Sequence, residues 1–408
     1  MKKSNQDSTQ HGMTRRDILG AIFGTVCVMP IAVRAFDSTD STENTLNKKR
    51  LIIYSLYGGN DGLNTVVPIL DPLYKNYRPN LALPANTLLP INDELALHAE
   101  LSFLHSAFEK GEVAIFQDVG YPYPNLSHFE SRAIWDSAKP ALGKRASTGW
   151  YGDLVTANRK EFDAANLDVA AISFLAADLF ASGNGVSALN TSNIQGFLAN
   201  EIVENKLPGD VPEALNYLAH QIKKNEIVRS RLLKRLRNAD LPRWDAYQDS
   251  LQSQIKMVEY FLRNQVQVPA LKIYQDGFDT HTGQMTEHSA LLSKFDQSLK
   301  QLVSSLKSLG IWQDAAIWVY SEFGRRPHEN GGGGTDHGTA GPAFLLGGSV
   351  RGGVYGQRAD LGDLDENGNL KFTTDFRHIY STLADRHFRL HKNPFADAGF
   401  AVMEGVFA

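Results

Sequence analysis

The chain has 408 residues, of which 42% are hydrophobic and 21% are charged, so it contains enough apolar material for a large globular core. Its formal net charge of -4 argues against a nucleic-acid-binding protein that depends on a basic surface, so no nucleic-acid partner is expected. Cysteine chemistry is also excluded if the N-terminal segment is removed, because the only cysteine is Cys27.

Residues 1–35 predict a twin-arginine signal peptide. Arg15 and Arg16 precede an apolar stretch over 18–33, and Ala35 ends a plausible cleavage site. The alternative is an uncleaved membrane anchor, but about sixteen apolar or small residues fall short of the ~20 that span a bilayer. We therefore expect a periplasmic or secreted protein that uses the twin-arginine export machinery and has no stable membrane span in its mature form.

Short apolar runs predict the strands of a single α/β domain over 50–408. A polar, aperiodic stretch over 36–49 precedes this domain and predicts a linker. The apolar runs alternate with helix-like or loop segments, which is typical of a mainly parallel sheet with helices on both faces. The predicted strands cover 50–57, 113–119, 167–174, 271–274 and 315–320.

Long helices are predicted in the second half of the chain. Two charged, helix-periodic segments around Pro242 predict a helical insertion at about 211–264, placed where it can cover a site. The clearest amphipathic helix covers 287–309, where leucines and a phenylalanine recur at spacings of three and four, and Gly310 follows as a natural stop. A closing helix is predicted over 374–388.

Carboxylates and imidazoles gather just after several of these strands. Asp279 and His281 follow the strand at 271–274, and Glu322 follows the strand at 315–320. His337 lies in the glycine-rich loop after Glu322, and Asp61 follows the first strand in a Gly-Gly-Asn-Asp-Gly segment. Asp, Glu and neutral His are donors that Zn²⁺ or Mn²⁺ prefers, and open α/β sheets bind ligands at the carboxyl ends of their strands.

Each of these residues also has a structural interpretation. An Asn-Asp-Gly segment is often only a tight turn, and Asp279 with His281 can form a hydrogen-bonded turn. Glu322 can pair with Arg325 and do nothing else. The metal-site hypothesis rests on the recurrence of the same donor types after successive strands, and Arg325 is its candidate for binding a substrate anion.

Ser127 and His128 form the remaining candidate catalytic pair. Ser127 stands at the start of a predicted helix, with Glu130 three residues later, which fits a capping box. A helix N-terminus also stabilises anions, so the same serine is a candidate hydroxyl nucleophile. The segment therefore predicts a helix cap, a nucleophile or both.

Taken in order, these motifs resemble a bacterial family catalogued as a domain of unknown function, number fifteen-oh-one, in the alkaline-phosphatase-like superfamily. The resemblance covers roughly 50–390 and rests on six segments. They are the twin-arginine leader, Gly-Asn-Asp-Gly-Leu-Asn-Thr at 59–65, Ser-His-Phe at 127–129, Gly-Phe-Asp-Thr-His at 277–281, Ser-Glu-Phe-Gly-Arg at 321–325 and Gly-Thr-Asp-His-Gly at 334–338.

The resemblance implies a three-layer α/β/α sandwich with a two-metal site, for Zn²⁺ or Mn²⁺, and a hydroxyl nucleophile. By position, Ser127 would be the nucleophile, Asp279 and His281 would bind one metal with His337, and Glu322 would bind the other. Asp61 would be the ligand after the first strand. The chain departs from the superfamily at Glu322-Phe323, where an Asp-His pair is usual, and His128 is a candidate replacement.

The leading functional hypothesis is an exported metal-dependent hydrolase acting on a small anionic phosphate or sulfate ester. Two alternatives follow from the same residues. One is a non-enzymatic periplasmic binding or assembly factor with a degenerate metal site, which Glu322-Phe323 favours. The other is a metal-independent esterase that uses Ser127 with a nearby histidine.

Overall fold

The computed structural model describes residues 45–140, 146–199, 213–236, 241–243 and 250–408. The predicted signal peptide and most of the predicted linker lie outside the described residues. The linker prediction is wrong at its end, because Leu46 is 3% exposed and Lys49 forms a 2.8 Å ion pair with Asp314. The folded domain therefore begins before the first strand. No helix among the described residues is both long and apolar enough to cross a bilayer.

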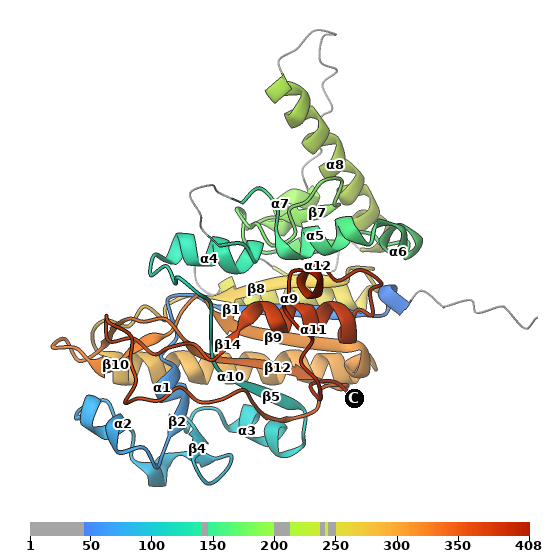
Figure 1. The fold of residues 1–408 in the computed structure, drawn as a ribbon. Helices are drawn as coiled ribbons and strands as arrows, with labels where there is room; N and C mark the ends of the chain where they lie inside the picture. The colour runs from blue at the N-terminus through green and yellow to red at the C-terminus, as the bar shows by residue number, and fades with distance from the viewer. Residues whose placement is uncertain (1–44, 141–145, 200–212, 237–240, 244–249) are drawn as a thin grey trace, which may run out of the picture. The chain divides into compact units, whose positions relative to one another are not determined.

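A nine-stranded sheet runs through the centre of the domain (Figure 1). Its strand order is β13-β5-β12-β9-β1-β8-β6-β7, with β14 added beside β5. All pairs are parallel except those that β12 makes with β5 and β9, so the mainly parallel sheet is as predicted. The strands are β1 (Arg50–Leu56), β5 (Val113–Gly120), β6 (Ala171–Ser173), β7 (Ala188–Asn190), β8 (Ala270–Gln275), β9 (Ala315–Ser321), β12 (Gly341–Gly347), β13 (Gly353–Tyr355) and β14 (Thr374–Asp375).

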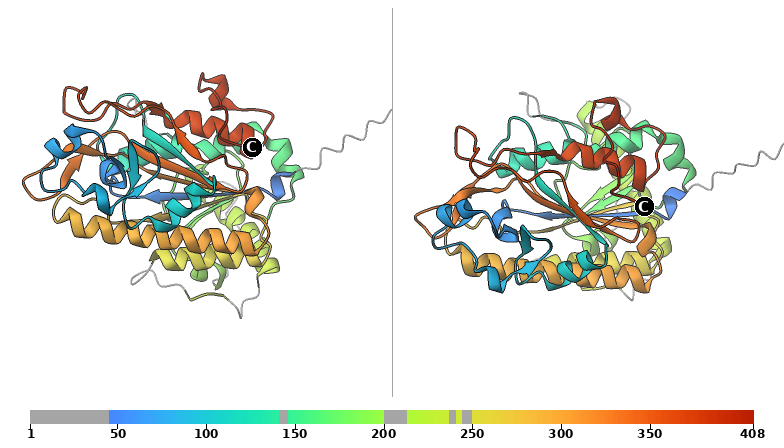
Figure 2. Two further views of the ribbon diagram at one scale, coloured as in Figure 1. Left: turned by 90° about the horizontal axis from the view of Figure 1, so that it is seen from below. Right: turned by 60° about the horizontal axis from the view of Figure 1, so that its bottom comes forward.

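Helices cover both faces of this sheet and make the three-layer α/β/α arrangement (Figure 2). In β1, Ile52 and Tyr54 pack into the apolar cluster beneath α3 (Ser102–Glu109), α9 (Ser250–Arg263) and α10 (Gln284–Ser308). Leu51 and Ile53 pack on the opposite face, beneath α4 (His128–Ser137), α5 (Trp150–Ala157) and α11 (Phe376–Thr382). Burial on both faces explains why the central strands are continuous apolar runs.

The predicted long helices are largely present. The amphipathic helix is α10, which ends just before Gly310, a residue with φ +70°. The closing helix is shorter than predicted, because Thr374 and Asp375 join the sheet as β14. The Asp375 side chain then accepts a hydrogen bond from the Arg377 amide and caps α11, which continues into a π-helical turn over Leu383–His387.

The predicted insertion contains α8 (Glu213–Arg235) and α9. Gln254 of α9 exchanges hydrogen bonds with the backbone of Tyr274 in β8, so α9 is part of the helix layer on one sheet face. Arg235 of α8 pairs with Asp168 just before β6, at the end of the strand remote from its carboxyl edge. The part of the insertion that the structure describes therefore packs with this helix layer. It does not lie over the carboxyl ends of the strands.

Smaller elements complete the domain. A three-stranded sheet has the order β2-β4-β3, and a two-stranded hairpin pairs β10 with β11. The strands are β2 (Val66–Pro68), β3 (Leu89–Pro90), β4 (Leu95–Leu97), β10 (Arg325–Glu329) and β11 (Thr335–His337). The short helices are α1 (Gly62–Thr65), α2 (Pro72–Tyr77), α6 (Arg159–Ala164), α7 (Ile194–Ala199) and α12 (Pro394–Asp397).

A buried ion cluster fastens α4 to the sheet. Lys272 of β8 is 2% exposed, and its Nζ lies 2.5 Å from Asp136 of α4 and 3.2 Å from Asp178. Breaking such a buried pair leaves an uncompensated charge, so the cluster holds α4 firmly against β8. This matters for function because the first residue of α4 is His128.

Candidate metal centre

Three histidines and one aspartate converge at the carboxyl edge of the sheet. Asp279 Oδ1 lies 2.9 Å from His337 Nε2 and 3.1 Å from His281 Nε2, and these two nitrogens are 3.1 Å apart. The other carboxylate oxygen, Oδ2, lies 3.4 Å from His128 Nε2. Asp279, His128 and His337 form a group whose donor atoms can reach a common ion. We call these four residues the imidazole–aspartate cluster.

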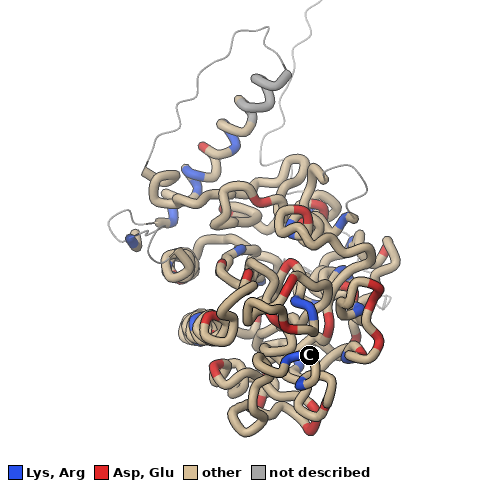
Figure 3. The backbone as a smooth tube through the Cα atoms, turned by 90° about the vertical axis from the view of Figure 1, so that its left-hand side faces the viewer, with Lys and Arg blue, Asp and Glu red and all other residues tan. Residues whose placement is uncertain are grey.

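The fold brings the four residues together from distant parts of the chain. Asp279 and His281 follow β8, His337 ends β11, and His128 begins α4 after β5. Strand β1 lies between β8 and β9, so the loops after β8 and β9 meet beside the Gly-Gly-Asn-Asp-Gly segment that follows β1. The end-on view in Figure 3 shows acidic and basic positions intermixed at this side of the molecule.

Every imidazole in the cluster is oriented through its other ring nitrogen. His337 Nδ1 lies 2.9 Å from the carbonyl oxygen of Leu126, and His128 Nδ1 lies 2.9 Å from Glu322 Oε1. His281 Nδ1 lies 3.4 Å from Asp336 Oδ1. Carbonyl and carboxylate oxygens only accept hydrogen bonds, so the Nδ1 atoms of His337 and His128 carry a hydrogen, and the neutral form of either ring has a free lone pair on Nε2.

Bare nitrogens in this arrangement fit a divalent cation. Two Nε2 lone pairs facing each other at 3.1 Å, with a carboxylate oxygen beside them, repel unless a cation or proton lies between them. The Nε2 atom of His128 is buried and has no hydrogen-bond partner. Ligand atoms 2.0–2.2 Å from a tetrahedral zinc ion lie roughly 3.3 Å apart, close to the spacing of these atoms. Imidazoles held by an outer acceptor are also the usual form of histidine metal ligands.

The carboxylates around the cluster are held in their ionised form. Burial raises the pKa of Asp279, but contacts with His337 and Arg325 outweigh burial and hold that pKa well below its usual range. Burial likewise opposes ionisation of Glu322, but the His128 hydrogen bond and the Arg132 charge lower its pKa. The hydrogen bond to Glu322 raises the pKa of His128.

Glu322 orients a histidine in this structure. It is fully buried, and its Oε1 atom accepts hydrogen bonds from the Gly58 amide at 2.9 Å, His128 Nδ1 at 2.9 Å and Arg132 Nε at 3.3 Å. The structure places Glu322 behind His128, in the outer shell of the cluster. The second-metal role implied by the resemblance therefore has no support in the geometry of this residue.

Arg325 positions the aspartate. Its side chain is buried, and its nitrogens donate to the carbonyl oxygens of Gly58, Gly59, Phe278 and Thr335 and to Asp279 Oδ1, the last at 2.6 Å. Nη2 makes three of these contacts, and Nη1 and Nε make one each, while 0% of the side chain is exposed, so the guanidinium is not accessible to an anion from solvent. Its burial favours a structural role over the predicted substrate-binding role, because Arg325 connects three loops beneath Asp279.

Asp61 lies outside the cluster, in a buried ion pair. Its Oδ2 atom accepts hydrogen bonds from Arg78 Nη1 at 2.6 Å and Gln284 Nε2 at 2.5 Å, and both Asp61 and Arg78 have 0% exposed side chains. Burial raises the pKa of Asp61, but the charge of Arg78 outweighs it and lowers the pKa. This contact favours a structural role for Asp61 over the expected metal-binding role, because a guanidinium already neutralises the carboxylate.

Ser127 precedes His128 at the start of α4. It occupies the N-cap position, but its side chain makes no capping hydrogen bond, so the predicted capping box is not formed. The residue is exposed, and its amide donates to Asn125 Oδ1 at 2.8 Å. The structure brings Ser127 to the edge of the cluster without showing a contact between its hydroxyl and any histidine.

Several residues of this region were not predicted from the sequence. Arg78 pairs with Asp61, Arg132 contacts Glu322, and Asp336 faces His281. Arg132 was detectable in principle, because it lies four residues after His128 and therefore on the same face of a helix. Arg78 carried no such signal, because it stands in no motif and reaches Asp61 only through the position of α2.

Glycine at position 58 allows the loops to meet. Gly58 has φ +119°, and a Cβ atom there would lie 2.3 Å from the Asp279 amide nitrogen. We expect Gly58→Ala to displace Asp279 and lower zinc affinity by roughly tenfold or more. Gly310→Ala is the control, since Gly310 has φ +70° but open space around it, and it should cost about 1 kcal/mol without changing zinc affinity. Competition titration with a chromophoric chelator measures the zinc affinity of both variants. Unchanged zinc affinity in folded Gly58→Ala protein would contradict the expectation.

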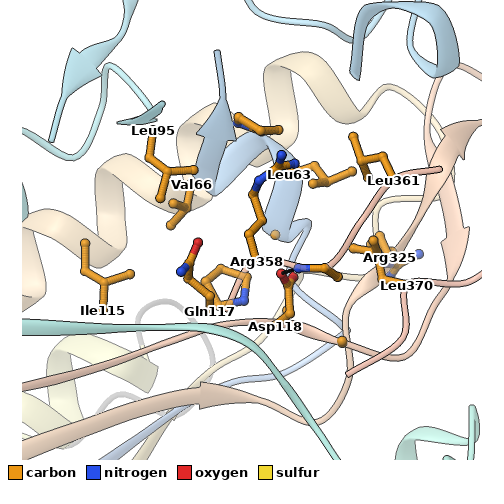
Figure 4. Close-up of a pocket in the computed structure, with 16 residues that line it drawn as sticks. Leu63, Val66, Leu95, Ile115, Gln117, Asp118, Arg325, Arg358, Leu361 and Leu370 are labelled. Atoms are coloured by element: carbon orange, nitrogen blue, oxygen red, sulfur yellow. Dashed lines mark hydrogen bonds between the residues drawn. The ribbon is translucent and has the colours of Figure 1, made fainter. Parts of the chain in front are cut away.

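Arg325 also lines a separate pocket (Figure 4). Its lining is mostly apolar and includes Leu63, Val66, Leu95, Leu361 and Leu370. None of the four cluster residues lines it. Its most unusual polar group is Asp118, whose pKa burial raises to about 6 and whose carboxylate accepts a 2.6 Å hydrogen bond from the Ala359 amide. The pocket is therefore distinct from the imidazole–aspartate cluster.

Residues 248–398 match the model of a family described as "Protein of unknown function (DUF1501)". This segment carries Asp279, His281, Glu322, Arg325 and His337, so the resemblance deduced from these motifs is confirmed here. No curated protein is significantly similar to the chain in sequence.

Solved structures similar to this chain include sulfatases and a protein in the alkaline phosphatase superfamily. One is the PsFucS1 sulfatase from Pseudoalteromonas sp., with 11% identity, a TM-score of 0.39, and coverage of 84% of this chain and 68% of that chain. Another is a protein in the alkaline phosphatase superfamily from Vibrio parahaemolyticus, with 11% identity, a TM-score of 0.35 and coverage of 76% and 62%. A third is the C-terminal periplasmic domain of EcEptC from Escherichia coli in complex with Zn, with 8% identity, a TM-score of 0.35 and coverage of 73% and 72%. The chain thus spans less than two thirds of the Vibrio protein, and the α/β fold class rests on the sheet order itself.

Proposed function

We propose that the chain is a metal-dependent hydrolase that acts on a small anionic ester, either a phosphate or a sulfate ester. The observation that carries this proposal is the convergence of bare imidazole nitrogens on Asp279. Asp279, His281 and His337 would hold one ion, with His128 beside them. Imidazole ligands favour Zn²⁺ over Mn²⁺. A bound ion of this kind polarises an ester oxygen and lowers the pKa of a bound water.

The charges around the cluster support an anionic substrate. Asp279 pairs with Arg325, Glu322 with Arg132 and Asp61 with Arg78, so each carboxylate is balanced by one guanidinium. A further carboxylate beside the cluster, Asp336, is 52% exposed and therefore screened by water. A divalent ion added to this balanced set leaves excess positive charge, which attracts an anion and stabilises charge that develops on it.

Ser127 is our proposed nucleophile, because it is exposed at the positive end of α4 and adjoins His128. A metal-independent serine esterase is less well supported. In that mechanism a histidine Nε2 would face the serine hydroxyl. Here the Nε2 atom of His128 lies 3.4 Å from Asp279 Oδ2, although its Nδ1 is held by Glu322 as a triad histidine would be.

A non-enzymatic metal-binding factor is the second candidate function. It is favoured by the positions of Asp61 and Glu322, since neither residue contributes to the imidazole–aspartate cluster. We also propose that the protein acts in the periplasm or outside the cell, after export by the twin-arginine machinery through the segment over 1–35. Its substrate there would be a small anionic ester.

Hydrolysis of synthetic esters tests the proposed activity. The purified, zinc-loaded full chain should hydrolyse at least one member of a panel of aryl phosphate and aryl sulfate esters. Activity should disappear with a strong chelator and return with Zn²⁺. Zinc-loaded protein that is inactive on the whole panel would favour the binding factor. Activity that survives chelation would favour the serine esterase, and covalent labelling of Ser127 by a fluorophosphonate would then identify its nucleophile.

A further inference from the structure

Arg132 stands beside the imidazole–aspartate cluster with part of its guanidinium uncommitted. It lies on α4, one helical turn after His128, and its side chain is 25% exposed. Its Nε atom lies 3.3 Å from Glu322 Oε1, and its guanidinium carbon lies 3.9 Å from the centre of the Tyr57 ring. The Tyr57 ring is in turn stacked on Tyr274, with centroids 5.4 Å apart.

These contacts fix the plane of the guanidinium but use only one of its donors. The ion pair occupies Nε, and the aromatic contact occupies one face. Neither Nη atom of Arg132 makes a hydrogen bond with any of the residues that the structure describes. Arg325 and Arg78 differ in this respect, because both are fully buried and their guanidinium groups are bound to carboxylates and carbonyl oxygens.

One carboxylate oxygen links this arginine to the cluster. Glu322 Oε1 accepts hydrogen bonds from both His128 Nδ1 and Arg132 Nε. The same oxygen atom therefore positions a cluster imidazole and the two Nη groups of Arg132. His128 Nε2 faces Asp279 on the other side of its ring. Two parallel donors at a fixed distance from the cluster suit the paired oxygens of a tetrahedral anion.

We infer that Arg132 is the substrate-binding arginine, and that its two Nη groups hold two oxygens of the phosphate or sulfate group of the ester. This inference rests on the proposed function and adds the residue that selects a tetrahedral oxyanion. It replaces Arg325 in that role. A lysine cannot take its place, because an ammonium group cannot both anchor on Glu322 and present a planar fork.

Binding of inorganic phosphate and inorganic sulfate to the zinc-loaded full chain tests the inference by calorimetry. Arg132→Gln and Arg132→Lys should each lower affinity for the anion that the wild type binds by at least tenfold, with zinc affinity, titrated separately, changed less than threefold. Arg377→Gln is the matched control, since Arg377 is likewise anchored on a carboxylate, Asp375, and on an aromatic face, that of Phe400. It should leave anion affinity unchanged.

The two readouts separate the possible failures. A wild-type chain that takes up no zinc refutes the proposed metal-dependent function itself. Zinc-loaded wild type that binds neither anion overturns the role assigned to Arg132. Zinc-loaded Arg132→Gln protein that binds the anion as tightly as wild type overturns it as well. Restoration of wild-type affinity by lysine would contradict the fork geometry.

Discussion

Asp279→Asn should lose nearly all bound metal, whereas the wild-type chain should retain zinc through purification. One oxygen of this carboxylate lies within 3.1 Å of two cluster nitrogens, His281 Nε2 and His337 Nε2. An amide oxygen carries no full negative charge, so it cannot balance a cation among neutral imidazoles. Elemental analysis of dialysed protein measures the effect.

Asp336→Asn is the graded control for this experiment. Asp336 contacts the Nδ1 side of His281 and would not touch the ion, so its loss should weaken zinc binding by about 10- to 100-fold without abolishing it. Full zinc content in Asp279→Asn would remove the aspartate from the metal site. Equal losses in both variants would show that Asp336 does more than orient His281.

Asp61→Asn should destabilise the protein strongly and leave zinc binding intact. The substitution leaves the Arg78 guanidinium buried, with 0% of its side chain exposed and no charged partner. Removing one partner of a buried ion pair typically lowers the free energy of unfolding by about 3–5 kcal/mol. Urea unfolding of metal-free protein measures this loss of stability. Zinc titration of the folded variant tests whether zinc binding is intact.

Asp363→Asn provides the matched control for the stability measurement. Asp363 pairs with Lys371 at 2.5 Å, but both side chains are more than half exposed. An exposed pair contributes within about 1 kcal/mol, so this variant should unfold nearly like wild type. A zinc-binding defect in folded Asp61→Asn would return Asp61 to the metal site, and a stability loss no larger than that of Asp363→Asn would contradict the role of the buried pair.

The main strands were predictable because their sequence signal is local. Strands β1, β8 and β9 are buried on both faces, so each is a continuous apolar run that needs no knowledge of its neighbours. The boundaries of the closing helix were not predictable in this way. Thr374 and Asp375 belong to the predicted helix but pair with Val119 and Gly120 of β5 in the structure. Local periodicity cannot indicate a contact between residues more than 250 positions apart.

Local sequence also predicted which types of donor residue lie at the site. It did not predict the role of each residue. The spacing of Asp279 and His281, two residues apart after a strand, correctly indicated that both side chains reach one place. Whether Glu322 binds a metal or orients a histidine depends on His128, which lies 194 residues away. The role of Asp61 likewise depends on a distant residue, Arg78. The sequence around Arg78 contains no motif that indicates this pairing.

Three carboxylates near the carboxyl edge of the sheet thus have three different surroundings. Asp279 lies among imidazoles, Glu322 lies behind one imidazole, and Asp61 faces a buried guanidinium. The resemblance implies a two-metal site, whereas among the described residues one group of donor atoms can reach a common ion. A guanidinium beside Asp61 supplies the positive charge that a second ion would bring, and it needs no uptake from solution.

The number of zinc ions per wild-type chain tests this account most directly. Protein exported by its native route, purified without added metal and analysed for zinc against protein concentration, should contain close to one equivalent. A folded chain without metal would contradict the metal centre. Two equivalents, with the second lost in Asp61→Asn, would contradict the assignment of Asp61 to the buried pair with Arg78.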